Sequence, residues 1–145
     1  MSDIFTVDAS VYVNALNRHE SDSRQSQVFL ERLHVGSYAV YSPTLLLVEV
    51  AAAVARALND SDQAIEMALV IRDLPGQKWV SLDDALTQKS LELAARFRLR
   101  SADAIYAAVA EYCKSVLVTR DRQQMERLHN ALEVVTPEVA IARLC

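Results

Sequence analysis

The sequence predicts an α/β fold, a three-layer α/β/α sandwich with a mostly parallel sheet of about five strands. Short apolar segments rich in β-branched residues alternate with longer amphipathic segments along the chain. Strands that are separated by helices pair in parallel through right-handed crossovers. The 145 residues include only two glycines and three prolines, and 52% are apolar. We therefore expect helical crossovers rather than tight hairpins, and a single domain over residues 1–145.

The expected strands are recognised by their apolar and β-branched composition. They are residues 4–7, 38–41, 79–81, 116–119 and 133–136. Between the first two strands, helices are expected over residues 11–16 and 26–33, and Gly36 ends the second helix.

A long helical segment follows the second strand. Ser42 and Pro43 form a typical helix start, in which a capping hydroxyl precedes a proline at the first helical position. This helix and a second one after a polar turn predict a helical hairpin inserted over residues 43–74. The Pro75–Gly76 pair then breaks the chain before the third strand.

Helices also separate the later strands. Ser81 or Asp83 is expected to cap the helix that runs to about Phe97, and Ser101 is expected to cap the next one. A further helix follows the fourth strand, and Pro137 opens a terminal helix.

Several classes of protein are excluded by composition. The longest apolar run, Leu45–Ala55, is interrupted by Glu49 and is too short to cross a bilayer, so no membrane partner is expected. The N-terminus shows no secretory signal, and we expect a cytoplasmic protein. Cys113 and Cys145 are too few and too far apart for a disulfide framework or a zinc site.

The net charge of −4 argues against nucleic-acid binding over the whole surface, but it leaves room for a local basic rim. The candidate substrate-binding residues are Arg98 and Arg100, which precede Asp103, and Arg120 and Arg122, which flank Asp121. A solvated helix end is the commoner reason for such clusters, so both explanations stay open.

The first strand ends at Asp8, which is followed by Ser10. Ligands of open α/β sheets gather outside the carboxyl ends of the strands, so Asp8 lies where chemistry is usually done. Capping of the following helix is the alternative explanation for both residues. Asp121 follows a later apolar strand in the same manner, with Thr119 two residues before it.

Two further acids occupy helices. Glu49 has only apolar neighbours on its own helix face, and an isolated buried carboxylate is strongly unfavourable. An ion pair with Arg56, two turns along, is the structural alternative to a metal-binding or catalytic role. Asp103 lies in the first turn after Ser101, where the helix dipole alone favours a negative charge.

These carboxylates end two strands, start one helix and interrupt one apolar helix face, so all can converge on one cleft. Converging carboxylates repel each other unless a cation neutralises them, and hard oxygen ligands select Mg²⁺ or Mn²⁺. Such an ion can polarise a phosphodiester and generate hydroxide from a bound water. The predicted reaction is hydrolysis of a phosphodiester without a covalent intermediate.

In their order and spacing, Asp8, Glu49, Asp103 and Asp121 resemble the acidic quartet of the PIN-domain nucleases, most closely the VapC-type toxins of toxin–antitoxin pairs. The resemblance covers essentially the whole chain, including the segment 99–106. It implies that the quartet binds Mg²⁺ or Mn²⁺ and cleaves RNA. Ser10 matches the small hydroxyl position of the family, and Thr119 joins the candidate catalytic set. The glycine that often precedes the third acid is replaced here by Arg98 or a neighbour.

The resemblance also implies two protein partners, a second copy of the chain and a small antitoxin. The antitoxin would wrap a flexible C-terminal segment over the helical hairpin. One of its arginines could replace the metal in the acidic pocket, because a guanidinium pairs bidentately with carboxylates. The apolar content of 52% also favours a homodimer, because so small a chain would leave apolar surface that a second copy can bury.

Other acidic α/β folds fit less well. A haloacid-dehalogenase-like phosphatase would place a second Asp where Ser10 stands, and a receiver domain would place a Lys after a late strand. A P-loop enzyme would need glycines that the chain lacks. A non-catalytic PIN-like module that binds RNA or protein remains the alternative, although such a module would have no need for Glu49 on an apolar face.

Overall fold

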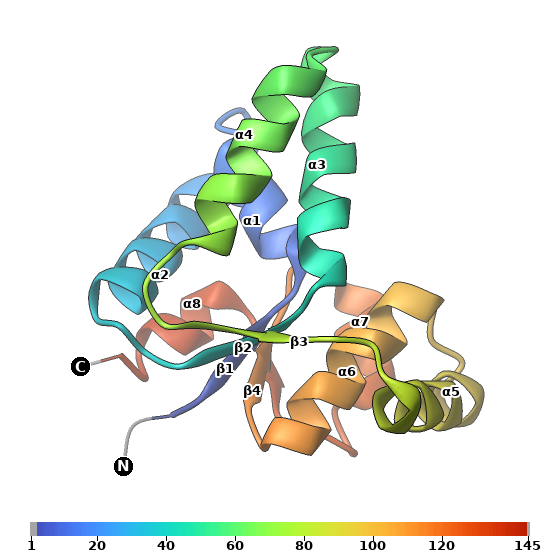
Figure 1. The fold of residues 1–145 in the computed structure, drawn as a ribbon. Helices are drawn as coiled ribbons and strands as arrows, with labels where there is room; N and C mark the ends of the chain where they lie inside the picture. Colours follow the sequence, from blue (N-terminus) through green and yellow to red (C-terminus); the bar gives the residue numbers. More distant parts are fainter. Residues whose placement is uncertain (1–2, 145) are drawn as a thin grey trace.

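The computed structural model describes residues 3–144 and is built around a parallel sheet (Figure 1). Its strands are β1 (Phe5–Val7), β2 (Val40–Pro43), β3 (Gln77–Val80), β4 (Val116–Val118) and β5 (Val134–Val135). They lie in the order β3-β2-β1-β4-β5, and each adjacent pair is parallel. The predicted α/β class and the predicted parallel sheet of about five strands are therefore confirmed.

Helices cover both faces of the sheet, which confirms the three layers. One side carries α1 (Ala9–Leu16), α2 (Ser23–Val35) and α8 (Pro137–Ile141), and the other carries α5 (Asp84–Phe97), α6 (Ser101–Cys113) and α7 (Arg122–Leu128). Helices α3 (Leu45–Leu58) and α4 (Ser61–Arg72) pack against each other and rise beyond the end of the sheet as a hairpin (Figure 1).

The core lies between the central strands and the helices on either face. Phe5 and Val7 of β1 and Leu117 of β4 are completely buried, as is typical of central strands of a parallel sheet. The Phe5 ring meets Phe29 of α2 edge to face, with 5.9 Å between the ring centroids. This core fixes the ends of β1 and β4, and acidic residues follow both strands.

The predicted break at Pro75–Gly76 is a turn that leads into β3. Gly76 has a φ of +85°, and a Cβ atom there would lie 2.1 Å from the carbonyl oxygen of Tyr38. Only glycine fits this turn, because any other residue would be strained and would collide with the backbone beside it.

The helix start predicted at Ser42–Pro43 is wrong, since both residues belong to β2 and pair with β3. The amides of Val40 and Thr44 donate to the carbonyls of Gly76 and Val80 on the β3 side, so Pro43 turns its nitrogen to the opposite side. On that side the pairing with β1 is confined to Phe5 and Val40. The missing N–H of proline therefore breaks no bond of the sheet.

Two other predicted caps are shifted along the chain. The residue that caps α1 is Asp8 rather than Ser10, and Arg100 rather than Ser101 precedes α6. The predictions that Asp83 caps α5 and that Pro137 opens α8 are confirmed.

Residues 3–144 contain no helix that is both long and apolar enough to span a membrane. Cys113 is a half-buried thiol with its pKa raised by burial, and Cys145 lies outside the described residues.

Candidate active site

The carboxyl ends of β1 and β4 lie side by side at the point where the strand order reverses. The pairing of Val7 with Val118 places the residues after these strands, Asp8 and Thr119, next to each other. The Asp8 amide donates to the carbonyl of Val118, and the Thr119 hydroxyl donates to Asp8 Oδ2 at 3.3 Å. Ligand sites of open α/β sheets form at such switch points.

Asp8 is buried, with only 6% of its surface exposed. Its Oδ2 accepts a hydrogen bond of 3.0 Å from the Ser10 amide, so the residue does cap α1 as the structural alternative supposed. Burial raises the pKa of Asp8 from 3.8 to about 6, and the negative charges of Glu49 and Asp103 add to the rise. A helix cap exposed on the surface would not have its pKa raised in this way by burial and by neighbouring carboxylates.

Hydroxyl groups tie the two strand ends together. Ser10 Oγ lies 3.3 Å from Thr119 Oγ1 and accepts a bond of 3.0 Å from the Arg120 amide. Thr119 Oγ1 accepts a bond of 3.0 Å from the Asp121 amide. The candidate residues Ser10 and Thr119 therefore connect Asp8 to the backbone that carries Asp121.

Glu49 reaches the site from α3 and is held by a residue that the sequence reasoning missed. The hydroxyl of the buried Tyr106 donates a bond of 2.7 Å to Glu49 Oε1. Burial raises the pKa of Glu49, and the charge of Asp103 raises it further. No ion pair between Glu49 and Arg56 is found in the described part of the chain, and Arg56 is exposed. A helical spacing of three residues from Asp103 to Tyr106 is the signal that could have revealed this tyrosine.

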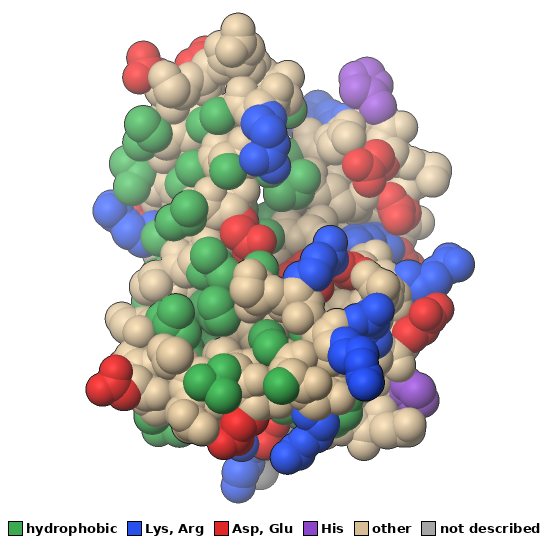
Figure 2. Space-filling model, turned by 90° about the vertical axis from the view of Figure 1, so that its right-hand side faces the viewer, with side chains coloured by type: hydrophobic (Ala, Val, Ile, Leu, Met, Phe, Trp, Pro, Cys, Tyr) green, Lys and Arg blue, Asp and Glu red, His purple; other side chains and the backbone are tan. Residues whose placement is uncertain are grey.

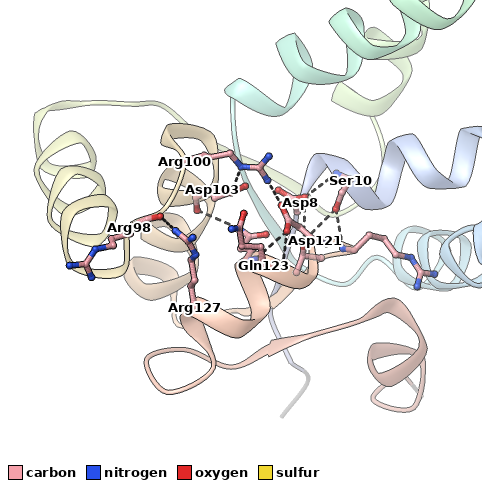
Figure 3. A network of polar contacts seen from close by, with 11 residues as sticks. Asp8, Ser10, Arg98, Arg100, Asp103, Asp121, Gln123 and Arg127 are labelled. Atoms are coloured by element: carbon pink, nitrogen blue, oxygen red, sulfur yellow. Dashed lines mark hydrogen bonds and ion pairs between the residues drawn. The ribbon is translucent and has the colours of Figure 1, made fainter.

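Asp103 and Asp121 share one basic partner, Arg100 (Figure 3). Arg100 Nε donates to Asp103 Oδ2 at 3.0 Å, and Nη2 donates to Asp121 Oδ2. Asp121 Oδ1 meanwhile caps α7 by accepting from the amides of Gln123 and Gln124. Burial raises the pKa of Asp103 although the Arg100 guanidinium acts against it.

The electrostatic contacts join all four predicted acids into one cluster. The negative charges of Glu49 and Asp103 raise the pKa of Asp8. The charge of Asp103 raises the pKa of Glu49, and the charge of Asp121 raises the pKa of Asp103. However, no three His, Cys, Asp or Glu side chains within residues 3–144 are positioned to hold a metal ion. The Arg100 guanidinium bonds to both Asp103 and Asp121, and its single positive charge offsets part of the negative charge of the cluster.

Lys and Arg side chains lie close to acidic side chains on one face of the molecule (Figure 2). The Arg100 side chain is 67% exposed, and Arg98 and Arg122 are also exposed. Arg98 has a left-handed backbone with a φ of 54°, and its carbonyl accepts a bond from Arg127 (Figure 3). This left-handed position ends α5 five residues before Asp103, where glycine is favoured.

Arg120 differs from the other candidate substrate-binding residues. Its side chain is only 13% exposed and bonds to Glu138 of α8 and to Ser26 of α2. All three guanidinium nitrogens already donate to protein groups, so we leave Arg120 out of the substrate-binding set proposed below.

Comparison with known proteins decides the family, since residues 5–131 match the PIN domain. The chain belongs to the PIN-domain family. Similar solved structures include a toxin–antitoxin complex from Klebsiella pneumoniae, with a TM-score of 0.65 and 20% identity over 94% of this chain and 98% of that one. VapBC2 from Rickettsia felis, bound to a DNA fragment from its promoter, has a TM-score of 0.67 and 20% identity over 92% and 98%.

A third similar structure is VapC20 from Mycobacterium tuberculosis, described as a toxin that cleaves the sarcin-ricin loop. It has a TM-score of 0.68 and 17% identity over 84% of this PIN-domain chain and 93% of that chain. No curated protein matches the chain. At these identities the solved structures establish the shared fold, and the site rests on the geometry of the chain itself.

Proposed function

We propose that this PIN-domain protein is a ribonuclease dependent on Mg²⁺ or Mn²⁺, and the toxin of a VapBC-type toxin–antitoxin pair. The observation that carries the proposal is the meeting of Asp8, Glu49, Asp103 and Asp121 in one electrostatic cluster at the carboxyl ends of β1 and β4. They come from four separate elements of the chain. Buried acids that perturb one another's pKa and come together from separate elements are typical of functional sites.

The donor set fits a hard divalent cation. Carboxylate oxygens are the ligands that Mg²⁺ and Mn²⁺ prefer, and the mutual repulsion of Asp8, Glu49 and Asp103 is relieved by positive charge. Asp8, Glu49, Asp103 and Asp121 would hold the ion once Arg100 leaves Asp103 and Asp121. A bound ion would supply Lewis-acid polarisation of the phosphodiester and a water molecule with a lowered pKa.

The protein's own groups fix the orientation of these carboxylates. Tyr106 holds Glu49 by a charge-assisted bond, and Thr119 and the Ser10 amide hold Asp8. Such supporting contacts keep reacting groups within the narrow geometry that catalysis needs. Tyr106 thus joins the proposed set as a positioning residue.

RNA would approach over the basic rim. Arg98, Arg100 and Arg122 are exposed, and Arg100 bonds directly to Asp103; positive charge on such side chains can offset the repulsion between phosphates and carboxylates. When Arg100 leaves Asp103 and Asp121, its guanidinium becomes available to a phosphate. We place this activity in the cytoplasm, where a toxin meets cellular RNA.

The proposed antitoxin has a groove to occupy beside the helical hairpin. The groove has a volume of about 640 Å³ and lies where the end of α1 meets α3 and α4. Its apolar lining includes Leu16, Ala53, Ala57 and Met67, and Arg18 and His19 also line it. Several of the similar solved structures are complexes of a toxin with its antitoxin, which supports a partner of this kind here.

A homodimer remains a proposal as well. Val48 of α3, Leu91 of α5 and Tyr112 of α6 are more than half exposed, and a second copy would shield such surface. Light scattering at micromolar concentration tests it, with a mass of twice 16.1 kDa expected and a monomer as the contrary result.

The nuclease assignment is tested with single-stranded RNA and three proteins, the wild type, Asp8→Asn and Asp84→Asn. Asparagine is also a good helix cap of nearly equal volume, so Asp8→Asn should fold and lose cleavage. Asp84 is exposed on α5, far from the cluster in the chain, and Asp84→Asn should keep full activity. EDTA should stop the wild type. Equal cleavage by all three proteins in EDTA would refute the assignment, and binding without cleavage would favour the non-catalytic module.

A further inference from the structure

Arg120 is the most extensively bonded arginine near the proposed active site, yet its side chain points away from the acids. Its Nε donates to Ser26 Oγ at 3.0 Å and its Nη2 donates to the carbonyl of Asp22 at 3.0 Å. Its Nη1 donates to both oxygens of Glu138, at 2.5 and 2.6 Å. The side chain therefore joins α2 and α8 to the segment that follows β4.

The backbone of Arg120 faces the acids. Its amide donates to Ser10 Oγ at 3.0 Å, and its two neighbours in the chain are Thr119 and Asp121. Thr119 bonds to Asp8, and Asp121 bonds to Arg100. One residue thus lies with its backbone in the proposed site and its side chain anchored outside it.

The anchor also reaches α1 at a second point. Ser26, which accepts from Arg120, donates a bond of 2.6 Å to Oδ1 of Asn14. Asn14 is buried and follows Ser10 by one helical turn on α1. Arg120 therefore holds α1 through Ser10 by its amide and through Ser26 and Asn14 by its side chain, which restricts both the position and the rotation of that helix.

We propose that Arg120 is a positioning residue of the nuclease site, rather than an RNA contact. It locks the segment 119–121 against α1, so that Asp8, Ser10, Thr119 and Asp121 keep their mutual geometry. The expected effect of Arg120 on the cleavage rate rests on the proposed function. Its effect on the structure of segment 119–121 can be tested without measuring cleavage.

The structural test is amide hydrogen exchange, measured by NMR on the wild type and on Arg120→Ala. The amides of residues 120 and 121 donate to the hydroxyls of Ser10 and Thr119, whereas those of Leu117 and Thr119 belong to the sheet. We expect exchange at residues 120 and 121 to become at least about tenfold faster in Arg120→Ala, while Leu117 and Thr119 stay protected. Unchanged exchange at 120 and 121 would overturn the proposal.

The kinetic test separates positioning from RNA binding. A displacement of about 1 Å of reacting groups can lower kcat about hundredfold, so Arg120→Ala should lower kcat and leave KM and its salt dependence unchanged. Arg122→Ala, by contrast, should raise KM and reduce the salt dependence, because it removes a phosphate contact. A change in KM and salt dependence alone for Arg120→Ala would overturn the proposal.

Conservative and neutral variants complete the design. Arg120→Lys keeps the charge but cannot reach Ser26, Asp22 and Glu138 together, so it should retain most of the defect; full recovery would contradict the proposed geometry. Arg24→Ala, on the exposed side of α2, should behave as the wild type. If Arg120→Ala does not fold, Glu138→Gln takes its place. Exchange at residues 120 and 121 should then become faster, but by a smaller factor. No change in exchange would contradict the proposal.

Failure of the proposed function gives a different outcome. If the wild type cleaves no RNA but Arg120→Ala still loosens the amides of residues 120 and 121, the nuclease assignment fails and the anchor stands.

Discussion

The Tyr106 hydroxyl donates to Glu49 Oε1 across 2.7 Å, from the buried face of α6 to the first turns of α3. This bond orients the one acid that enters the cluster from the helical hairpin. It also explains how a carboxylate tolerates an apolar helix face without an ion pair, because a hydrogen bond from a buried hydroxyl favours the charged form.

Removal of that hydroxyl should impair the site without unfolding the protein. Tyr106→Phe leaves Glu49 without its donor and raises the pKa of Glu49, since the Tyr106 bond acts to lower it. Loss of such a supporting contact reduces cation affinity or cleavage by about ten- to hundredfold. RNA cleavage and Mn²⁺ titration calorimetry measure both effects. Tyr112→Phe, at an exposed tyrosine of the same helix, is the control and should change neither.

Asp8 should make the cation-free protein less stable as pH rises. The pKa of Asp8 is raised from 3.8 to about 6 in the folded state, so folding favours the protonated carboxyl. Well below pH 4 Asp8 is neutral in both states, and above about pH 6 the folded protein carries a buried charge worth about 3 kcal/mol. The unfavourable contribution therefore appears between about pH 4 and pH 6 and persists above it.

Urea unfolding in EDTA at pH 4 and pH 7.5 measures this effect. Asp8→Asn should match the wild type at pH 4 and be more stable at pH 7.5, because its amide is neutral throughout. A variant that is less stable than the wild type at pH 7.5 would show that the buried charge is already compensated.

The left-handed residue before the third acid offers a stability test. Arg98 has a φ of 54° at the end of α5, a conformation that is unfavourable for residues with a Cβ. Arg98→Gly should therefore raise the free energy of unfolding by about 0.5–1 kcal/mol. Ala95→Gly, at an exposed helical position of the same element, should lower it by about 1 kcal/mol. Thermal or urea unfolding measures both changes in the free energy of unfolding. If the two substitutions changed it in the same direction, the conformational explanation would be contradicted.

The groove beside the hairpin predicts that antitoxin binding can be lost without loss of RNA cleavage. Ala57 is exposed and lines the groove, so Ala57→Arg should block an antitoxin segment while RNA cleavage is kept. Co-expression with the product of the neighbouring small open reading frame, followed by co-purification, measures the loss. Ala85→Arg, at an exposed alanine of α5, should still co-purify. If neither the wild type nor Ala85→Arg retains that product, the toxin assignment fails while the nuclease assignment stands.

Much of this architecture could be predicted because it depends on local composition. Asp8 and Asp121 follow short, fully buried strands, and the carboxyl ends of parallel strands meet at one edge of a sheet. Glu49 could be singled out because an acid on an apolar helix face needs a partner. The identity of that partner, Tyr106, depends on the packing of α6 against the rest of the site, which residue spacing alone does not specify.

The failures of sequence reasoning have physical causes as well. Ser42–Pro43 has the chemistry of a helix start, but pairing with β3 keeps both residues extended. The position of Arg120 beside Asp121 predicts an RNA-binding arginine, and this prediction has not been tested; in the structure its side chain bonds to Glu138 and Ser26. Glu138 comes from α8, and its contact with Arg120 is a tertiary contact with no local signal in the sequence.

The proposed cation would have to replace Arg100, because the Arg100 guanidinium bonds to both Asp103 and Asp121 where the cation would bind. The most direct test is a crystal structure with Mn²⁺, whose anomalous scattering locates the ion. The account predicts Mn²⁺ within direct coordination distance of at least two of Asp8, Glu49, Asp103 and Asp121, about 2.0–2.2 Å for such ions, with Arg100 turned away from Asp103 and Asp121. Mn²⁺ bound elsewhere, or absent while Arg100 keeps both carboxylates at saturating concentration, would contradict it.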